Sequence, residues 1–371
     1  MVSDLSPRTK QAFQVAGLIA TAMVVGIHYK TDIPDLPFIE HETANELAQE
    51  WLFGTVARVA VPFFAFAAGL FYFRSFDGRW SSYIEKLRGR GRTVLIPYFL
   101  IASTATTFWL AVQSLRGVPV EMTVPQFVSM WIFSPPVEQL WFLRDLLVIV
   151  TITPFIHRIF LSRFSAIPFV LLLLTCWLLN AQPLPLLAGR HLIHIETLCF
   201  FTIGATFAYH PEILNRIANW PSKNGYLFTA LWLTLVSVRV FLRPDFDIWY
   251  VHAYQIEDLV IHQCSVLLGC VALFWWSVRL SRPAMIRWSG ASFFVFLVHE
   301  YPLRAFVEQI IQKLGDPPAA CWFVVPLVVA STFACGIWGM RCFPRATTFL
   351  TGGRTPQRAL KISRSSFVES A

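Results

Sequence analysis

Apolar blocks of roughly 20 residues recur along this chain, and each is long enough to cross the hydrocarbon core of a bilayer as an α-helix. The sequence has 371 residues, of which 56% are hydrophobic and 14% are charged. Soluble domains carry about 25% charged residues, so this chain lacks the charge to cover a soluble surface. Strands of a membrane barrel alternate polar and apolar residues, whereas these blocks are apolar on all sides. The sequence therefore predicts an all-α polytopic membrane helical bundle.

Ten blocks are candidate transmembrane helices, so about ten spans are predicted. They cover residues 12–29, 51–73, 93–113, 140–160, 166–181, 194–210, 225–243, 258–279, 289–312 and 321–340. The first block follows Arg8 and Lys10 as in a signal peptide, but it is long and lacks a clear small-residue cleavage site, so we expect it to be retained. The membrane domain is predicted over residues 1–343, and the basic tail 344–371 is expected to be disordered.

The distribution of charge predicts the topology. With the N-terminus placed in the cytoplasm, 21 of the 30 Lys and Arg residues fall in cytoplasmic segments or the tail. Acidic residues instead concentrate in the first outer loop, residues 30–50. This positive-inside pattern predicts that both termini are cytoplasmic. It also accounts for the net charge of +8 without a nucleic-acid partner.

Ionisable side chains inside apolar spans are candidate functional residues, because the membrane tolerates them only when they are paired or face water. His28 ends the first span, and its imidazole suits proton transfer near neutral pH. Arg58 lies about two turns into the second span and needs an anion, carbonyl groups or water. An interfacial, hydrogen-bonded histidine and an arginine that reaches the outer surface are the structural alternatives.

Two adjacent charges, Arg144 and Asp145, stand near the start of the fourth span in "EQLWFLRDLL". Neighbouring side chains on a helix point about 100° apart, so we do not expect these two to pair well with each other. Each charge therefore needs a partner in another helix or a ligand. A structural ion pair between helices is the alternative to a functional role.

A polar stripe is predicted in the ninth span, in "FLVHEYPLRAF". Glu300, Arg304 and Glu308 recur at i, i+4 and i+8, whereas His299 points to another side. Pro302 weakens the helix locally and frees carbonyl groups that could line a cavity. A purely structural stripe is the alternative.

A basic stretch with Arg88, Arg90 and Arg92 lies at the cytoplasmic end of the third span. Attraction to anionic lipid headgroups is the ordinary interpretation of such a stretch. The alternative is a patch that binds the phosphates of a nucleotide-bearing cofactor. The pair His191 and His194 resembles a metal site only weakly, and no HExxH accompanies it, so no metal is predicted.

Five of these features, in chain order, resemble the bacterial acyltransferase 3 family of integral membrane acyltransferases. They are the first-span His28 and the stretches "RVAVPFFAFAAGLFYF", "KLRGRGRTVLIPY", "LWFLRDLL" and "SFFVFLVHEYPL", spread from residue 28 to about residue 303. The sequence departs from the family pattern at two positions. Gly17 stands where the family often has an Arg eleven residues before the histidine, and Ala68 stands where it often has a Ser.

The resemblance implies a bacterial inner-membrane enzyme that moves an acyl group, acetyl by default, from cytoplasmic acyl-CoA to a hydroxyl of an envelope glycan or glycolipid. His28 would be a general base or proton relay, and Arg58 and Arg144 would stabilise the oxyanion. The further catalytic candidates are Asp145, His299 and Glu300. The resemblance also implies that Arg88, Arg90 and Arg92 meet the CoA phosphates, with acyl-CoA as substrate and no bound cofactor.

Two other classes of protein fit the same residues. A transporter or flippase for an anionic or sugar-bearing substrate also needs charges inside the membrane. Transporters often have paired broken helices in two halves of the chain, and the sequence shows no such symmetry. A non-catalytic membrane component of an envelope glycan pathway is the other alternative. Alanine at His28 separates it from an enzyme, since only an enzyme loses turnover while it stays folded.

Overall fold

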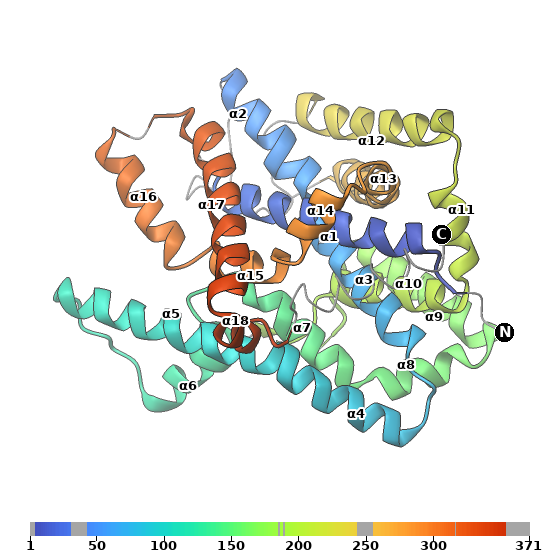
Figure 1. The fold of residues 1–371 in the computed structure, drawn as a ribbon, viewed down its shortest axis with the longest axis horizontal. Helices are drawn as coiled ribbons and strands as arrows, with labels where there is room; N and C mark the ends of the chain where they lie inside the picture. Colours follow the sequence, from blue (N-terminus) through green and yellow to red (C-terminus); the bar gives the residue numbers. More distant parts are fainter. Residues whose placement is uncertain are drawn as a thin grey trace.

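The computed structural model describes residues 4–30, 43–184, 186–187, 190–242, 255–315 and 317–353, and helices dominate it (Figure 1). Within these residues, seven helical segments are long and apolar enough to cross a membrane. They are Pro7–His28, Ala44–Arg74, Trp80–Leu115, Leu140–Phe160, Ser222–Phe241, Ile256–Arg279 and Ala320–Cys342. The shorter apolar helices are Val124–Phe133, Arg163–Leu178 and Ile195–Tyr209. The protein is thus an all-α polytopic helical membrane protein, as the sequence predicts.

The elements follow one another in this order. The first half contains α1 (Pro7–His28), α2 (Ala44–Gln49), η1 (Glu50–Thr55), η2 (Val56–Val59), α3 (Ala60–Arg74), α4 (Trp80–Arg90), η3 (Gly91–Leu95), α5 (Ile96–Leu115), α6 (Val124–Phe133), α7 (Leu140–Thr151), α8 (Thr153–Phe160) and α9 (Arg163–Leu178). The second half contains β1 (Leu186–Leu187), β2 (Arg190–His191), α10 (Ile195–Tyr209), α11 (Pro211–Ala218), α12 (Ser222–Leu242), α13 (Ile256–Arg279), α14 (Pro283–Ser289), α15 (Ser292–Val298), α16 (Leu303–Lys313), α17 (Ala320–Cys342) and α18 (Pro344–Leu350). The two short strands pair antiparallel.

Each predicted span falls mainly on helix. The fourth is divided at Ile152 between α7 and α8, and the ninth is broken over several residues. Residues 289–312 are divided among the end of α14, α15 and most of α16, with a break at residues 299–302. Pro302 lacks the N–H that would bond the carbonyl of Val298, so the helix cannot continue regularly through this point. The prediction of one continuous span here is wrong. The apolar helix α6 is an element that the sequence did not predict.

Two long segments contain irregular turns next to a proline, and both turns carry candidate site residues. In the segment Ala44–Arg74, the π-helical η1 and the 3₁₀-helical η2 precede α3. Pro62 has no N–H for the carbonyl of Arg58, so the regular bonding pattern is interrupted at the turn that holds this arginine. Pro97 likewise leaves the carbonyl of Thr93 without its usual donor, and the π-helical η3 lies there.

The core is held by an unusually close crossing of α3 and α10. A Cβ added at Gly69 would lie 1.9 Å from the carbonyl oxygen of Phe201, and one added at Gly204 would lie 2.0 Å from the carbonyl oxygen of Phe66. Small residues let membrane helices approach until their backbones touch. The two glycines therefore fix the distance between α3 and α10.

Segments predicted to be cytoplasmic contact one another. Asp4 forms an ion pair with Arg74 at the end of α3, and its carbonyl accepts from Asn215 in α11 at 3.0 Å. Arg279, which ends α13, donates to the carbonyl of Trp220 at 3.0 Å. These contacts gather the predicted inner ends of the helices at one end of the molecule.

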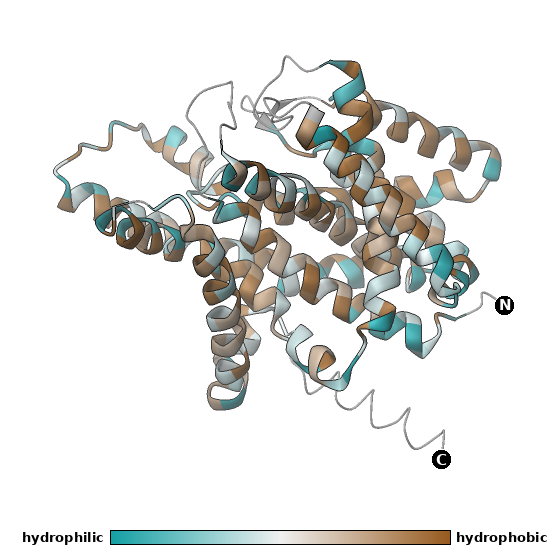
Figure 2. Ribbon diagram, turned by 90° about the horizontal axis from the view of Figure 1, so that it is seen from above, coloured by the Kyte–Doolittle hydropathy of each residue, from teal (hydrophilic) through white to brown (hydrophobic). Residues whose placement is uncertain are grey.

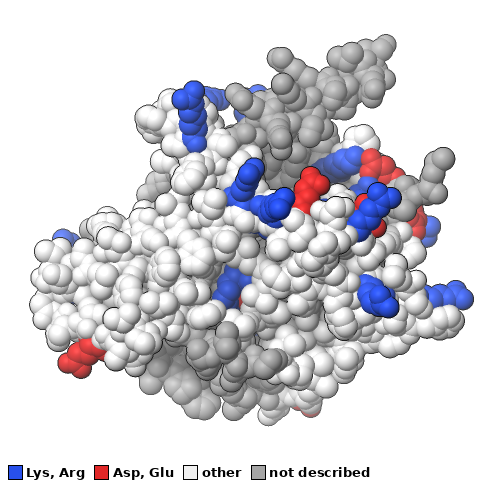
Figure 3. Space-filling model, turned by 90° about the horizontal axis from the view of Figure 1, so that it is seen from below, with Lys and Arg blue, Asp and Glu red and all other residues white. Residues whose placement is uncertain are grey.

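The surface agrees with a membrane location. The long helices are largely hydrophobic along their length, and hydrophilic residues gather toward helix ends and connections (Figure 2). Seen from the side of α4, Lys and Arg stand out on a mostly uncharged surface (Figure 3). The predicted tail begins with α18, whereas residues 354–371 lie outside the described residues, so its disorder and the domain limit at residue 343 stay predictions.

Candidate active site

His28 lies at the C-terminal end of α1, and the two residues after it are held firmly. The hydroxyl of Tyr29 donates to the carbonyl of His299 at 2.6 Å, and the Lys30 Nζ binds the buried Glu50 carboxylate at 2.6 Å. Both contacts join α1 to segments far away in sequence. The end of the first span is therefore positioned by tertiary contacts of the two residues that follow His28.

Three ionisable side chains surround the His28 imidazole. Its Nδ1 lies 3.6 Å from the Glu138 Oε2, and its ring centroid lies 5.2 Å from that of His299. The Arg304 Nη1 lies 3.8 Å from the same Glu138 oxygen. The Glu138 side chain is 66% exposed, so this cluster opens toward the molecular surface.

The hydrogen bonds of His299 fix which of its nitrogens carries a proton. Its Nδ1 lies 3.0 Å from the carbonyl oxygen of Val295 and 3.1 Å from that of Phe296. Carbonyl oxygens only accept, so Nδ1 is the donor and a neutral imidazole presents Nε2 as an acceptor. His299 is fully buried, and no described residue provides a hydrogen-bond partner for this Nε2. A buried acceptor thus lies beside His28.

The predicted polar stripe exists as a set of contacts. The Arg304 Nη1 lies 3.8 Å from the Glu300 Oε1, and its Nε donates to the Glu308 Oε1 at 2.7 Å. The stripe does not run along one helix, because Glu300 belongs to the break before α16. Arg304 connects this set to Glu138, and through it to His28.

Arg58 lies in the irregular turn before α3, and its side chain is half-buried. Its Nε donates to the carbonyl of Gly54 at 3.3 Å. Its charge acts on three groups from different helices, namely His28 of α1, Glu196 of α10 and His262 of α13. The irregular turn around Arg58 therefore brings a cation between the helices rather than to the outer surface.

Arg144 and Asp145 have partners outside α7, as expected, but they also pair with each other. The Arg144 guanidinium donates to the carbonyls of Phe133 at 2.6 Å and His191 at 2.8 Å. Asp145 accepts from the backbone N–H of His194 at 2.8 Å and lies 2.8 Å from its Nδ1. The Arg144 Nη2 also lies 3.3 Å from the Asp145 Oδ1. The expectation that the two charges do not pair well is wrong, because the long arginine side chain curls back to its neighbour.

These contacts give Arg144 and Asp145 a structural task. Both side chains are buried, and they hold the loop before α10 and the end of α6 against α7. In the part of the chain that the structure describes, neither one makes a hydrogen bond or ion pair with His28. Their predicted catalytic roles thus stay predictions, and the geometry favours the structural alternative.

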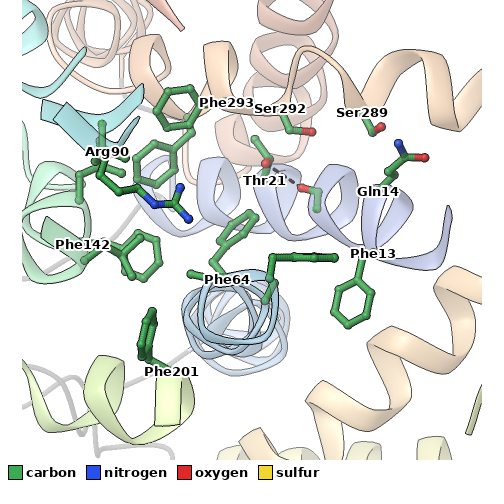
Figure 4. A pocket seen from close by; sticks show the side chains of 18 of the residues that line it. Phe13, Gln14, Thr21, Phe64, Arg90, Phe142, Phe201, Ser289, Ser292 and Phe293 are labelled. Carbon is green, nitrogen blue, oxygen red and sulfur yellow. Dashed lines mark hydrogen bonds between the residues drawn. The ribbon is translucent and has the colours of Figure 1, made fainter. Parts of the chain in front are cut away.

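A cavity of about 530 Å³ lies at the opposite half of α1. Phe13, Phe64, Phe142 and Phe293 line it, so its wall is mainly apolar (Figure 4). Its polar lining comes from Gln14, Thr21, Arg90, Ser289 and Ser292. Binding sites for small molecules have this size and this mixture of apolar wall and few polar groups.

The three arginines of the basic stretch separate in the structure. The Arg90 side chain points into the cavity, towards α1 and between Phe64 and Phe142 (Figure 4). Arg88 and Arg92 are exposed and line a surface groove with Ser81 and Glu85. Residues four apart share a helix face, whereas the residue between them points elsewhere. One cation is thus inside the cavity and two are at the surface.

The positions where this sequence departs from the family pattern both line the cavity. Gly17 and Ala68 belong to its wall, and a Cβ built on Gly17 would have no neighbour within 4 Å. Space for a larger side chain therefore exists at position 17. The guanidinium inside this cavity comes from Arg90 of α4 instead.

The cavity approaches the His28 cluster through aromatic side chains. Phe296 lines the cavity, and its ring centroid lies 6.2 Å from that of His299. Thr21, also in the wall, stands two helical turns before His28 on α1. An elongated molecule in the cavity would thus point one end towards the imidazole pair.

Sequence reasoning did not select Glu138, whose Oε2 lies 3.6 Å from the His28 Nδ1. No spacing in the sequence relates residue 138 to residue 28. No group of three or more His, Cys, Asp and Glu residues in the described ranges is arranged to hold a metal ion.

Comparison with known proteins assigns the chain to a family. Residues 15–341 match the model of the acyltransferase 3 family, which is described as an acyltransferase domain. This match covers nearly all of the described helices and includes both the cavity and the His28 cluster. Neither the comparison with curated proteins nor that with solved structures gives a match.

Proposed function

Because the chain belongs to the acyltransferase 3 family and is therefore a membrane acyltransferase, we propose that it transfers an acyl group, acetyl by default, from acyl-CoA to a hydroxyl of an envelope glycan or glycolipid. The observation that carries this proposal is the arrangement along α1. A cavity with a guanidinium lies at one half of the helix, and a histidine beside an acid lies at its other end. Acyl transfer needs a donor site and a base within reach of each other.

His28 is the general base of this mechanism. It takes the proton of the acceptor hydroxyl as the oxygen attacks the thioester carbonyl, and the C–O bond forms as the C–S bond breaks. The proton then passes to the sulfur, so CoA leaves as a thiol. The Glu138 carboxylate stabilises the imidazolium that forms in between. Arg58, whose charge acts on His28, stabilises the negatively charged oxygen of the tetrahedral intermediate.

The cavity receives the acyl-bearing arm of the donor. Its apolar wall excludes water and slows hydrolysis of the thioester. Arg90 interacts with polar atoms of the arm, and the exposed Arg88 and Arg92 bind the phosphates at the surface groove. The donor thus enters at the basic end of the bundle.

The positive-inside pattern supports a cytoplasmic position for this basic end, on the side where acyl-CoA is found. The seven long apolar segments support a multi-pass bundle, to which we assign about ten spans, both termini in the cytoplasm and a place in the bacterial inner membrane. His28 then lies towards the outer side, where an envelope glycan is available.

The test is acyl transfer by the purified protein in nanodiscs. Radiolabelled acetyl-CoA is supplied with and without an envelope-glycan fraction, and CoA release and labelled glycan are measured together. We expect release that depends on the glycan, and a loss of at least about 100-fold in His28→Ala, the usual effect of removing a general base.

His210→Ala is the matched control, because His210 is an exposed histidine in the connection after α10. It should keep wild-type activity. Glycan-independent release, or equal activity in the two variants, would refute the assignment of His28 as base. No release with any acyl-CoA and glycan would refute the proposed donor and acceptor.

A further inference from the structure

We propose that Glu196, Gln263, His262 and Arg58 form the subsite that binds the hydroxyl groups of the acceptor. The ligand class is a polyhydroxylated molecule such as a hexose unit. The inference rests on the proposed function and adds the place where the acceptor is recognised. Glu196, Gln263 and His262 each carry a buried polar atom that finds no hydrogen-bond partner among the described residues.

Trp177 of α9 orients two of these side chains. Its indole N–H donates to the Glu196 Oε2 at 3.1 Å, and its carbonyl accepts from the Gln263 Nε2 at 3.0 Å. One end of each side chain is thereby fixed. The other end, the Glu196 Oε1 and the Gln263 Oε1, finds no hydrogen-bond partner among the described residues.

The side chains that carry these two oxygens are buried. Glu196 is 9% exposed and Gln263 is 5% exposed. A buried oxygen without a partner is costly to desolvate, so such atoms usually mark a bound water or ligand. His262, next to Gln263 and 2% exposed, adds a third group of this kind, because its Nδ1 has no partner in the described part of the protein.

Arg58 connects this cluster to the catalytic histidine. Its charge acts on Glu196, His262 and His28, so the cluster and the proposed base lie around one guanidinium. The packing supports this, because α13 contacts the turn that carries Arg58 through the Cys270 Sγ, 3.8 Å from the carbonyl of Val59. The cluster and the proposed base thus share one neighbouring cation.

The chemistry of the cluster fits hydroxyl groups. Each hydroxyl donates one hydrogen bond and accepts others. The Gln263 and Glu196 oxygens can accept from hydroxyls, and the Arg58 guanidinium can donate to them. The donor is an elongated thioester whose site is the apolar cavity at the other half of α1, so it does not explain these polar atoms.

The rival interpretation is that the cluster only stabilises the fold. Gln263 caps a carbonyl in the last turn of α9, and Glu196 binds an indole, so both have structural contacts. Buried water could satisfy the remaining oxygens. A structural cluster would affect both substrates equally, whereas an acceptor subsite would affect only one.

The experiment therefore separates the two substrates. Wild type, Glu196→Gln and Gln263→Met are compared in nanodiscs, with acetyl-CoA as donor and an envelope-glycan fraction, quantified in hexose equivalents, as acceptor. Both changes keep side-chain size and replace an acceptor oxygen, and Gln263→Met also removes the Nε2 that donates to the Trp177 carbonyl. Half-saturation for the glycan should rise about tenfold or more, the effect of losing a buried hydrogen bond. Half-saturation for acetyl-CoA should stay within about twofold.

Glu212→Gln is the matched control, since Glu212 is an exposed acid in α11. It should match wild type in both substrates. Unchanged glycan half-saturation in both cluster variants would overturn the subsite and leave the proposed function intact. An equal effect on both substrates would assign the cluster to the fold and also overturn the subsite. If wild type itself transfers nothing to the glycan, the proposed function fails, and this inference fails with it.

Discussion

Replacing Gly204 by alanine tests whether the contact of α3 and α10 sets the geometry of the protein. The added Cβ would lie 2.0 Å from the carbonyl oxygen of Phe66, whereas ordinary contacts begin at 3.4 Å. The helices must therefore separate by about 1.4 Å at this point. Overpacking of this kind costs about 1–3 kcal/mol, and the helix propensity of alanine returns about 1 kcal/mol. Because the clash is with backbone, we take the upper value and expect a net loss of about 2 kcal/mol.

Gly17→Ala is the matched control. Gly17 also lies inside a long apolar helix, but its Cβ would meet nothing within 4 Å. Only the gain in helix propensity remains, so this variant should be more stable by up to about 1 kcal/mol. The two alanines should therefore differ in stability by about 3 kcal/mol in opposite directions from wild type.

The assay is reversible unfolding of the purified protein by SDS, followed by tryptophan fluorescence. Gly69→Ala, whose Cβ would lie 1.9 Å from the Phe201 carbonyl oxygen, should behave like Gly204→Ala. If Gly204→Ala were as stable as Gly17→Ala, the crossing would be loose and the reasoning would be refuted. Separation of the helices would also move Arg58 and Glu196, so activity should fall with stability.

Three further changes test the site. Glu138→Gln should lower the rate of acyl transfer about tenfold without changing half-saturation for acetyl-CoA, because a neutral amide stabilises the His28 imidazolium less than a carboxylate does. An unchanged rate would remove Glu138 from the mechanism. Arg90→Met should raise half-saturation for acetyl-CoA by about tenfold. Arg79→Met, which changes an 81% exposed side chain, should leave it unchanged. Identical acetyl-CoA titrations of these two variants would contradict the donor cavity. Glu50→Gln leaves the buried cations Lys30 and Arg239 beside a neutral partner, so the free energy of unfolding in SDS should fall by about 3–5 kcal/mol. Wild-type stability of this variant would show that the ion cluster is dispensable.

The candidate site was only partly accessible to reasoning from the sequence. Charges inside apolar spans stand out because the membrane penalises them, and this selected His28, Arg58 and the Arg144–Asp145 pair. The contacts in the structure then distinguish the roles of these residues. His28 has an acid and a second histidine beside it, whereas Arg144 and Asp145 hold the loop before α10. The cost of burying a charge is visible in a sequence, but its partner is not.

The basic stretch shows the same limit at short range. Composition identifies Arg88, Arg90 and Arg92 as one cluster of cations. Helical geometry then points Arg90 away from the other two, into a cavity whose wall comes from α1, α3, α7, α14 and α15. No local pattern could show that cavity, because its lining residues are far apart along the chain.

The sequence by itself determined that this protein is an all-α membrane bundle, because apolar length and charge distribution are local properties set by the thickness and asymmetry of the bilayer. It also contained the ordered motifs of the acyltransferase 3 family. Only the tertiary structure decided which polar residues meet. The pairs Glu138 with His28, Glu50 with Arg239, and Trp177 with Glu196 depend on helix crossings, and those crossings are fixed by backbone contacts such as the one at Gly69 and Gly204.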